Sequence, residues 1–289
     1  MNDKGIHCIN SEIPYKLSEM SDYESKFYLA QEHEDLLSIL LAFDQFCRSH
    51  EILYSIADGT LLGAMRHADF IPWDDDADVM LTKDEYVKLR KALKQGGNIK
   101  LFKVSFLDRV STPEMLSKGK YIDLFINEDM PKSKNVFGCK KLITAFLRTS
   151  FRGMPENYRQ RCYSKGKKLI HRTLNLISCV LSHIVIGNRN VFDLNERAVA
   201  IGKYKSSGIY TRYTSRMYET KRRFDKVSYD EGYANIAFRG HILMSIKNAD
   251  TFLREMYGDY MKLLPEDKRK PEHPVNMLDA AENCVCRYN

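Results

Sequence analysis

Apolar positions recur along the chain with two periods, one typical of helices and one typical of strands. Between Tyr23 and His50 they return every three to four residues with polar groups between them, which predicts an amphipathic helix. Ile52–Ile56 then has the composition of a short strand. A turn at Asp58 and Gly59 leads into a predicted helix over Thr60–His67.

The same two patterns alternate through the next part of the chain. Ala77–Leu81 is a predicted strand, and Thr82 with Glu85 forms a capping-box signature for a helix that ends near Gly96 and Gly97. Further predicted elements are strands at 99–107, 121–126, 224–227 and 234–238, and a helix capped by Asn248 or Asp250 that ends at Gly258.

This alternation predicts an α+β protein, a mixed sheet with flanking helices. We expect an N-terminal extension over residues 1–28, a catalytic core over 29–130, a basic helical insertion over 131–205 and a carboxy-terminal module over 206–289 that completes the site. A chain of 289 residues, 44% of them hydrophobic, is long enough to bury such a core.

Neither the amino terminus nor the cysteine spacing indicates a special class of protein. The amino terminus lacks the pattern of an export signal, and polar residues interrupt the longest apolar stretch, Leu169–Ile186, so we expect a cytoplasmic protein. The seven cysteines contain no CxxC pair, so reduced thiols are expected.

Basic residues are concentrated in one segment of the chain. From Lys132 to Arg172 the chain has twelve basic residues and a single acid, Glu156. Three interpretations remain open: an element lying on an anionic membrane, at the inner face of the plasma membrane; a solvated basic face; or a nucleic-acid surface, which is disfavoured because no recognition motif accompanies it.

The strongest chemical signal is a run of four carboxylates directly before an apolar strand: Asp74, Asp75, Asp76 and Asp78, preceded by Trp73. Side chains alternate along a strand, so Asp76 and Asp78 point to one side, at a spacing that a divalent cation can bridge. Asp123, a lone acid in the apolar run at 121–125, is the expected third ligand, because an unpaired buried carboxylate is costly.

Upstream, Gly59 and Thr60 stand at a helix start, where free backbone N–H groups can hold a phosphate. A glycine-containing helix start, then Asp-x-Asp, then a third acid on another strand resembles the pattern of nucleotidyltransferase-fold enzymes. Read as one motif, residues 59–67 with 70–78 resemble the LicD family, which is related to the fukutin-type transferases. Residues 257–269 with His273 are similar to that family's carboxy-terminal signature.

The resemblance implies metal-dependent transfer of a phosphorylated alcohol, such as phosphocholine from CDP-choline, onto a hydroxyl of a cell-surface glycan or its lipid-linked precursor, with release of CMP. Mg²⁺ or Mn²⁺ would be held by Asp76, Asp78 and Asp123, which are also the expected catalytic residues. The expected substrate-binding residues are Gly59, Thr60, Arg66, Trp73, Asp74, Asp75, Arg269 and His273. Two alternatives stay open: a nucleotidyltransferase that releases pyrophosphate, and an inactive binding scaffold.

Overall fold

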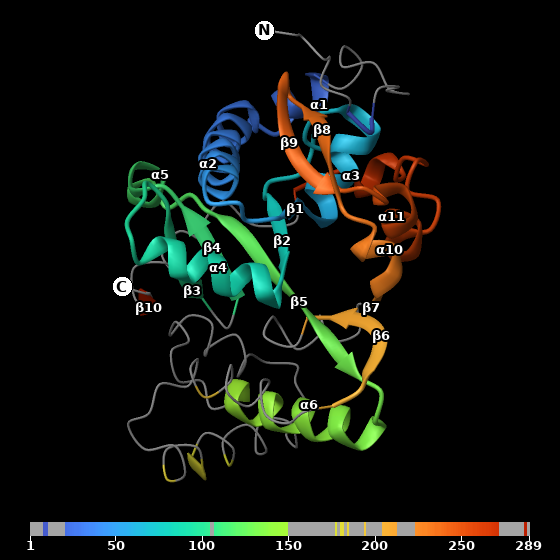
Figure 1. Ribbon diagram of the computed structural model, residues 1–289. Helices are drawn as coiled ribbons and strands as arrows, with labels where there is room; N and C mark the ends of the chain where they lie inside the picture. The colour runs from blue at the N-terminus through green and yellow to red at the C-terminus, as the bar shows by residue number, and fades with distance from the viewer. Residues whose placement is uncertain are drawn as a thin grey trace, which may run out of the picture.

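The computed structural model describes residues 8–10, 21–104, 107–149, 177, 180, 181, 184, 194, 204–212, 223–271 and 286–287. In this part of the chain, helices flank a mixed sheet, which confirms the expected α+β class (Figure 1). The helices are α1 (Ser21–Lys26), α2 (Ala30–Ser49), α3 (Asp58–His67), α4 (Lys83–Leu93), α5 (Pro113–Ser117), α6 (Lys134–Thr149), α10 (Lys226–Asp230), α11 (Ala249–Tyr257) and the short 3-10 helix η3 (Glu266–Lys268).

The strands of the main sheet follow the order β1, β2, β5, β4, β3, β10, and β6 and β7 extend it from the far end of β5. Only β2 and β5 are parallel among the described pairs, and this pair joins Asp78 to Asp123 in register. The bounds are β1 (Ser55–Ile56), β2 (Asp78–Thr82), β3 (Lys100–Val104), β4 (Leu107–Ser111), β5 (Ile122–Pro131), β6 (Ser206–Thr211), β7 (Arg223–Asp225) and β10 (Cys286–Arg287).

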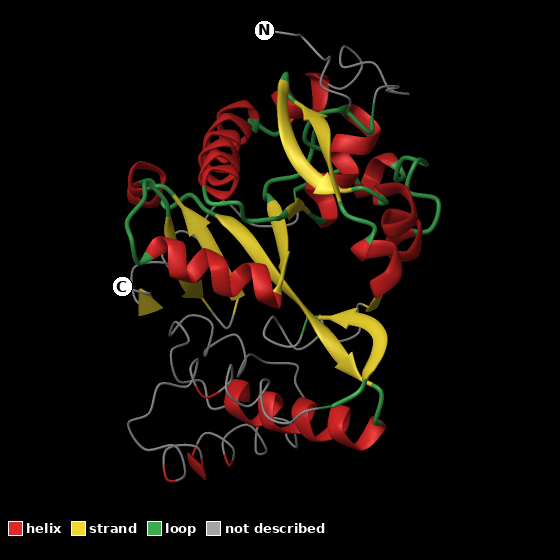
Figure 2. Cartoon of the chain, in the orientation of Figure 1, coloured by secondary structure: helices red, strands yellow, loops and turns green. Residues whose placement is uncertain are grey.

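A separate hairpin, β8 (Tyr233–Phe238) and β9 (His241–Ile246), packs beside β1. The backbone N–H of Ile246 donates to the Ser55 hydroxyl at 3.0 Å. Figure 2 shows the hairpin as a pair of yellow strands above the main sheet. The carboxy-terminal part of the chain therefore packs against the strand that precedes the acidic site.

The apolar stripes predicted from the sequence form the core. Residues Leu36, Leu40, Phe43 and Cys47 of α2 are all buried. Thr82 caps α4 as expected, because its side chain accepts from the Glu85 backbone N–H at 3.4 Å. The cap of α11 is Asn248, without a side-chain cap bond, and the helix ends at Gly258, which has a positive φ of 68°.

Two strand predictions were wrong in extent. The single strand expected over 99–107 is a pair of antiparallel strands, β3 and β4, and the strand expected to continue to residue 227 ends at Asp225, where α10 begins. Hydrophobic periodicity does not mark these boundaries, because the residues on both sides of each are strand-like or amphipathic. The elements β6, β9 and α5 were not predicted.

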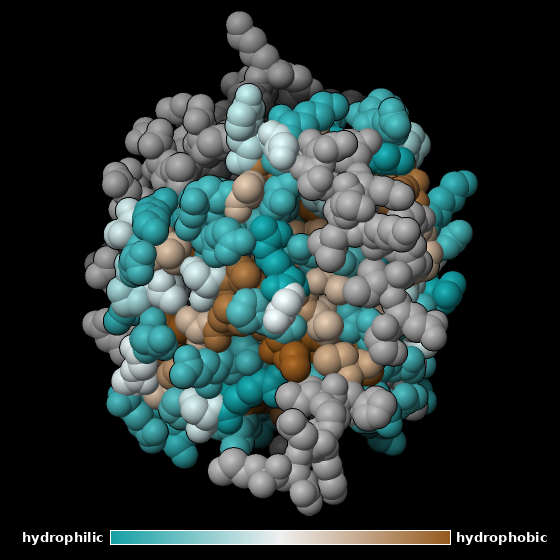
Figure 3. All heavy atoms as spheres, turned by 90° about the horizontal axis from the view of Figure 1, so that it is seen from above, coloured by the Kyte–Doolittle hydropathy of each residue, from teal (hydrophilic) through white to brown (hydrophobic). Residues whose placement is uncertain are grey.

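The helices of the described part include none that is long and apolar enough to cross a membrane. Among the described cysteines, Cys8, Cys47 and Cys139 are free thiols, as expected. Figure 3 looks down on the end of the molecule that carries the β8–β9 hairpin and shows hydrophilic side chains over most of the described surface, with apolar ones gathered near its centre.

Candidate active site

The expected catalytic acids lie together where β2 and β5 begin. Asp78 and Asp123 are register partners on these parallel strands, and the Asp123 backbone N–H donates to the Ala77 carbonyl at 2.9 Å. Adjacent strands lie about 4.8 Å apart, so the two carboxylates start from neighbouring backbone positions. Asp76 stands two residues before Asp78, just outside β2, and its charge acts on Asp78.

Burial and mutual repulsion act strongly on Asp78, which is 8% exposed. Its pKa is raised well above the usual value, first by desolvation and then by the charges of Asp76, Asp58, Asp123 and Asp74. Five carboxylates thus share one electrostatic environment. A bound divalent cation would relieve this repulsion.

Hard oxygen donors of this kind fit Mg²⁺ or Mn²⁺. Within the described residues, no three acidic, histidine or cysteine side chains already form a complete cation site. Asp123 is held by another partner, because Arg109 Nε donates to its Oδ1 at 2.8 Å. The carboxylate oxygens suit the cation as ligands. To coordinate it fully, the carboxylate groups would have to move closer together.

Arg109 is a site residue that the sequence did not suggest. It faces Asp123 in the β4–β5 register, is 7% exposed, and lies 4.0 Å from the centre of the Tyr121 ring. The only sequence signal would have been the charged residues Asp108 and Arg109 within the otherwise strand-like run 107–111. Arg109 fixes the orientation of the Asp123 carboxylate.

Arg212 is a second unpredicted residue. Its guanidinium donates to both carboxylate oxygens of Asp58, at 2.7 and 3.1 Å, and stacks 4.1 Å from the centre of the Phe125 ring. Arg212 is fully buried, and Asp58 is 4% exposed. This pair joins β6, from the carboxy-terminal part, to the first turn of α3.

Gly59 and Thr60 hold the site together by close packing. A Cβ on Gly59 would lie 2.5 Å from Asp74 Oδ2, so the Asp74 carboxylate could not keep this position beside α3 if Gly59 carried a side chain. The Thr60 hydroxyl accepts from the Asp78 backbone N–H at 2.8 Å and thereby ties α3 to the start of β2. These contacts give both residues a positioning role, and their phosphate contact stays a prediction.

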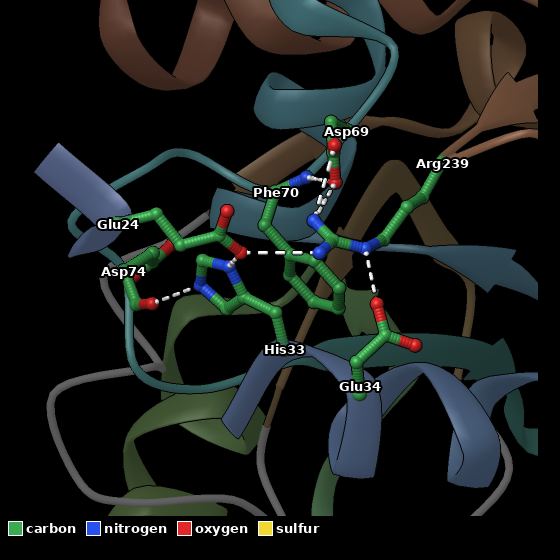
Figure 4. Close-up of polar contacts among 7 residues, drawn as sticks. All are labelled: Glu24, His33, Glu34, Asp69, Phe70, Asp74 and Arg239. Atoms are coloured by element: carbon green, nitrogen blue, oxygen red, sulfur yellow. Dashed lines mark hydrogen bonds and ion pairs between the residues drawn. The ribbon is translucent and has the colours of Figure 1, made fainter. Parts of the chain in front are cut away.

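A buried histidine, His33, contacts the acidic loop, residues 73–77, which precedes β2 (Figure 4). His33 Nε2 lies 2.8 Å from the Asp74 carbonyl oxygen and Nδ1 lies 2.7 Å from Glu24 Oε1, while the ring stacks on Phe70. Arg239 joins the same network by donating to Asp69, Glu24 and Glu34. Helices α1 and α2, the acidic loop and the β8–β9 hairpin therefore meet at this network.

The structure brings only some of the expected substrate-binding residues to the acids. Trp73 is 6% exposed, Asp74 and Asp75 are half-buried beside it, and the Arg269 guanidinium lies 5.7 Å from the Trp73 ring centre. The carboxy-terminal signature thus reaches the acidic loop. His273 lies outside the described residues.

Arg66 is not a solvated helix-end residue. It is 3% exposed, its Nε donates to His67 Nε2 at 2.9 Å, and its Nη1 donates to the Tyr260 carbonyl at 2.9 Å. These contacts attach the segment after α11 to the end of α3. A direct contact with the leaving group stays a prediction.

Comparison with known proteins agrees with this geometry. Residues 51–137 match the family model described as LicD/FKTN/FKRP, nucleotidyltransferase domain. The chain is 28% identical over 268 residues to a Haemophilus influenzae protein named lipopolysaccharide cholinephosphotransferase LicD, which covers 86% of this chain and 97% of that protein. Uncharacterized proteins of Rickettsia typhi and Rickettsia prowazekii are each 35% identical over 78 residues, covering 26% of this chain and 25% and 29% of their own lengths.

The family match spans α3, the acidic loop, β2 and β5, so it contains Asp76, Asp78 and Asp123 together with Gly59 and Thr60. The resemblance seen in the sequence motifs is confirmed: residues 51–137 match the nucleotidyltransferase domain model of the LicD family.

Proposed function

We propose that this protein is a metal-dependent phosphotransferase that moves a phosphorylated alcohol, phosphocholine or a similar group, from a CDP-linked donor to a hydroxyl of a cell-surface glycan or its lipid-linked precursor. The observation that carries the proposal is the register pair Asp78 and Asp123 beside Asp76, within the LicD family domain. Similarity to a protein named as a cholinephosphotransferase, over most of both chains, supports this reaction class.

In the proposed reaction the acceptor hydroxyl oxygen attacks the phosphorus that bears the alcohol, the bond from this phosphorus to the CMP oxygen breaks, and CMP leaves. Phosphoryl transfer depends mainly on positioning and charge neutralisation. Mg²⁺ or Mn²⁺, when bound, would supply charge neutralisation at the pyrophosphate. Asp76, Asp78 and Asp123 would hold the cation.

Residues of this chain would carry out the remaining tasks. Asp123 would take the proton of the attacking hydroxyl, while Arg109 keeps the carboxylate oriented. The first turn of α3, at Gly59 and Thr60, would present backbone N–H groups to the donor phosphates. Trp73 and Arg269 would form one wall of the donor pocket.

A lipid-linked acceptor would bring the protein to the inner face of the plasma membrane as a peripheral protein. Nucleic acid is not part of the proposed function, because the site requires only a nucleotide. The second candidate function is a nucleotidyltransferase that releases pyrophosphate, which the name of the matched domain favours.

The test is to incubate the protein with CDP-choline, CDP-ribitol or CDP-glycerol and a glycan acceptor, and in a parallel reaction with CTP and a phosphorylated alcohol, with Mg²⁺ or Mn²⁺ in both, and to measure CMP and pyrophosphate. We expect CMP from one donor, and a fall of at least about a hundredfold in Asp76→Asn and in Asp123→Asn. Asp84→Asn, which removes an exposed carboxylate of α4, is the matched control and should keep full activity.

Pyrophosphate in place of CMP, formed from CTP and a phosphorylated alcohol, would replace the proposal by the second candidate. Neither product with any donor, from folded protein, would indicate a binding scaffold.

A further inference from the structure

Helix α6 directs several of its apolar side chains outward. Leu142 is 71% exposed, Ile143 41% and Val136 36%, whereas the polar residues Lys140 and Thr144 are 4% and 1% exposed. An amphipathic helix on a protein surface normally has the opposite arrangement. A free surface of this kind is costly in water, so the outward face of α6 requires a partner.

Specific contacts fix this orientation. The Lys140 ammonium lies 4.8 Å from the centre of the Tyr204 ring, and the Tyr204 hydroxyl donates to the Asp129 carbonyl at 2.8 Å. Leu147 is buried on the same inward side. The helix is therefore anchored to β5 through its polar side, and rotation to bury Leu142 would break these contacts.

A second group of exposed apolar side chains lies in the chain segment after α6. Four residues with helical conformation, Ile177, Val180, Leu181 and Ile184, are 50%, 54%, 47% and 74% exposed. Their spacing of three, four and seven residues places them on one face of a helix. The exposed apolar surface thus extends beyond α6.

Charge identifies the kind of partner. Helix α6 contains no acidic residue, its Lys134 and Lys141 are exposed, and Lys132 precedes it on the surface. A second copy of this chain would bring basic residues against basic residues. A nucleic acid would be met by stacking aromatic rings, but the most exposed side chains here are aliphatic.

Exposed aliphatic side chains suit the apolar interior of a lipid bilayer, and the lysines beside them suit its anionic head groups. We infer that the outward face of α6, with Ile177, Val180, Leu181 and Ile184, docks this protein on an anionic membrane surface, with the aliphatic side chains inserted and the lysines at the head groups.

The position of this surface suits a lipid-linked acceptor. Strand β5 runs from Asp123 at the candidate active site to Pro131, just before α6, a path of at most roughly 26 Å. An acceptor sugar that extends from the lipid could span this distance. Only this choice of acceptor rests on the proposed function, because docking itself requires no catalysis.

The experiment measures binding of the full chain to vesicles of phosphatidylcholine with and without phosphatidylglycerol, by co-sedimentation at low and high salt. We expect binding only with phosphatidylglycerol, weaker in high salt. Leu142→Asp should lower the partition constant about tenfold or more, and Lys134→Gln with Lys141→Gln should lower it by a similar factor. Val87→Asp, which changes an exposed apolar residue of α4, is the matched control and should bind like the wild type.

Absence of wild-type binding to phosphatidylglycerol vesicles, or equal binding of Leu142→Asp, would overturn the inference. So would a wild-type dimer in light scattering that Leu142→Asp converts to a monomer, because the face would then be a self-interface. Asp76→Asn separates the two proposals: it should bind vesicles like the wild type while failing to release CMP.

Discussion

At the scale of single residues, Gly59 is a position where an added side chain would meet a carboxylate of the candidate active site. A Cβ there would meet Asp74 Oδ2 at 2.5 Å. Gly59→Ala should displace the acidic loop and lower CMP release by about tenfold to a hundredfold, because small displacements of catalytic groups are costly. Gly138→Ala, on α6, is the control, since a Cβ there meets nothing within 4 Å. Equal activity of both variants would show that the Asp74 position is unimportant.

His33 offers a test of the network behind the same loop. The side chain in His33→Gln reaches less far towards Glu24 or towards the Asp74 carbonyl. We expect kcat to fall about tenfold with a smaller change in KM, because the acids are displaced but the donor pocket remains. A change in thermal stability alone, with kcat intact, would assign His33 a purely structural role. His241→Gln, at an exposed histidine of β9, is the control.

His67 should make folding stability depend on pH. Burial, and then the charge of Arg66, lower the pKa of His67 from 6.5 to about 3. Between these values the unfolded chain binds a proton that the folded chain does not. The free energy of unfolding should therefore fall as the pH is lowered from 6.5 towards 3, by up to about 1.4 kcal/mol per pH unit. Urea unfolding at several pH values should show a smaller slope for His67→Gln, and an unchanged slope would contradict the assignment.

At the scale of elements, the buried Arg212–Asp58 pair joins β6 to α3. Arg212→Ala should destabilise the protein by about 3–5 kcal/mol, because Asp58 would keep a buried charge without its guanidinium partner. Arg254→Ala removes an arginine that is also paired with an aspartate, 2.8 Å from Asp250, but on the surface, and should leave the unfolding midpoint nearly unchanged. Denaturant unfolding of both variants checks this difference, and equal effects would contradict it.

Distance along the chain explains which elements and residues could be predicted. Asp76, Asp78, Gly59 and Thr60 lie in one local motif, which the sequence alone makes visible. Arg109 bonds a residue 14 positions away, His33 one 41 positions away and Arg212 one 154 positions away. Only the folded sheet defines such pairs, because register and crossover decide which residues meet.

At the scale of the whole molecule, the local sequence pattern predicts strands, and the fold decides how they pair. Strands β2 and β5 were foreseeable as two apolar strands that each carry an acid, and β7 was predicted with a different end, whereas β6 was not predicted, although it extends the same sheet. Hydrophobic pattern indicates that a segment is a strand but not which neighbour it pairs with. The outward apolar face of α6 was likewise hidden, because the sequence pattern gives an amphipathic helix without saying which face is buried.

The stability of the whole molecule should report on cation binding. Asp78 is crowded by Asp76, Asp58, Asp123 and Asp74, so the metal-free protein carries unfavourable repulsion at its active site. Adding Mg²⁺ or Mn²⁺ should raise the melting temperature as the concentration passes the dissociation constant, since only the folded chain assembles the acids.

Asp78→Asn should act in two directions at once. It removes one of the crowded charges, so the metal-free variant should melt at or above the wild-type temperature, and it removes a ligand, so most of the stabilisation by Mn²⁺ should be lost. Asp84→Asn, the exposed control on α4, should melt and respond to Mn²⁺ like the wild type. A variant that melts lower than the wild type without metal yet keeps the full response to Mn²⁺ would mean that Asp78 is a structural residue and that the cation binds elsewhere.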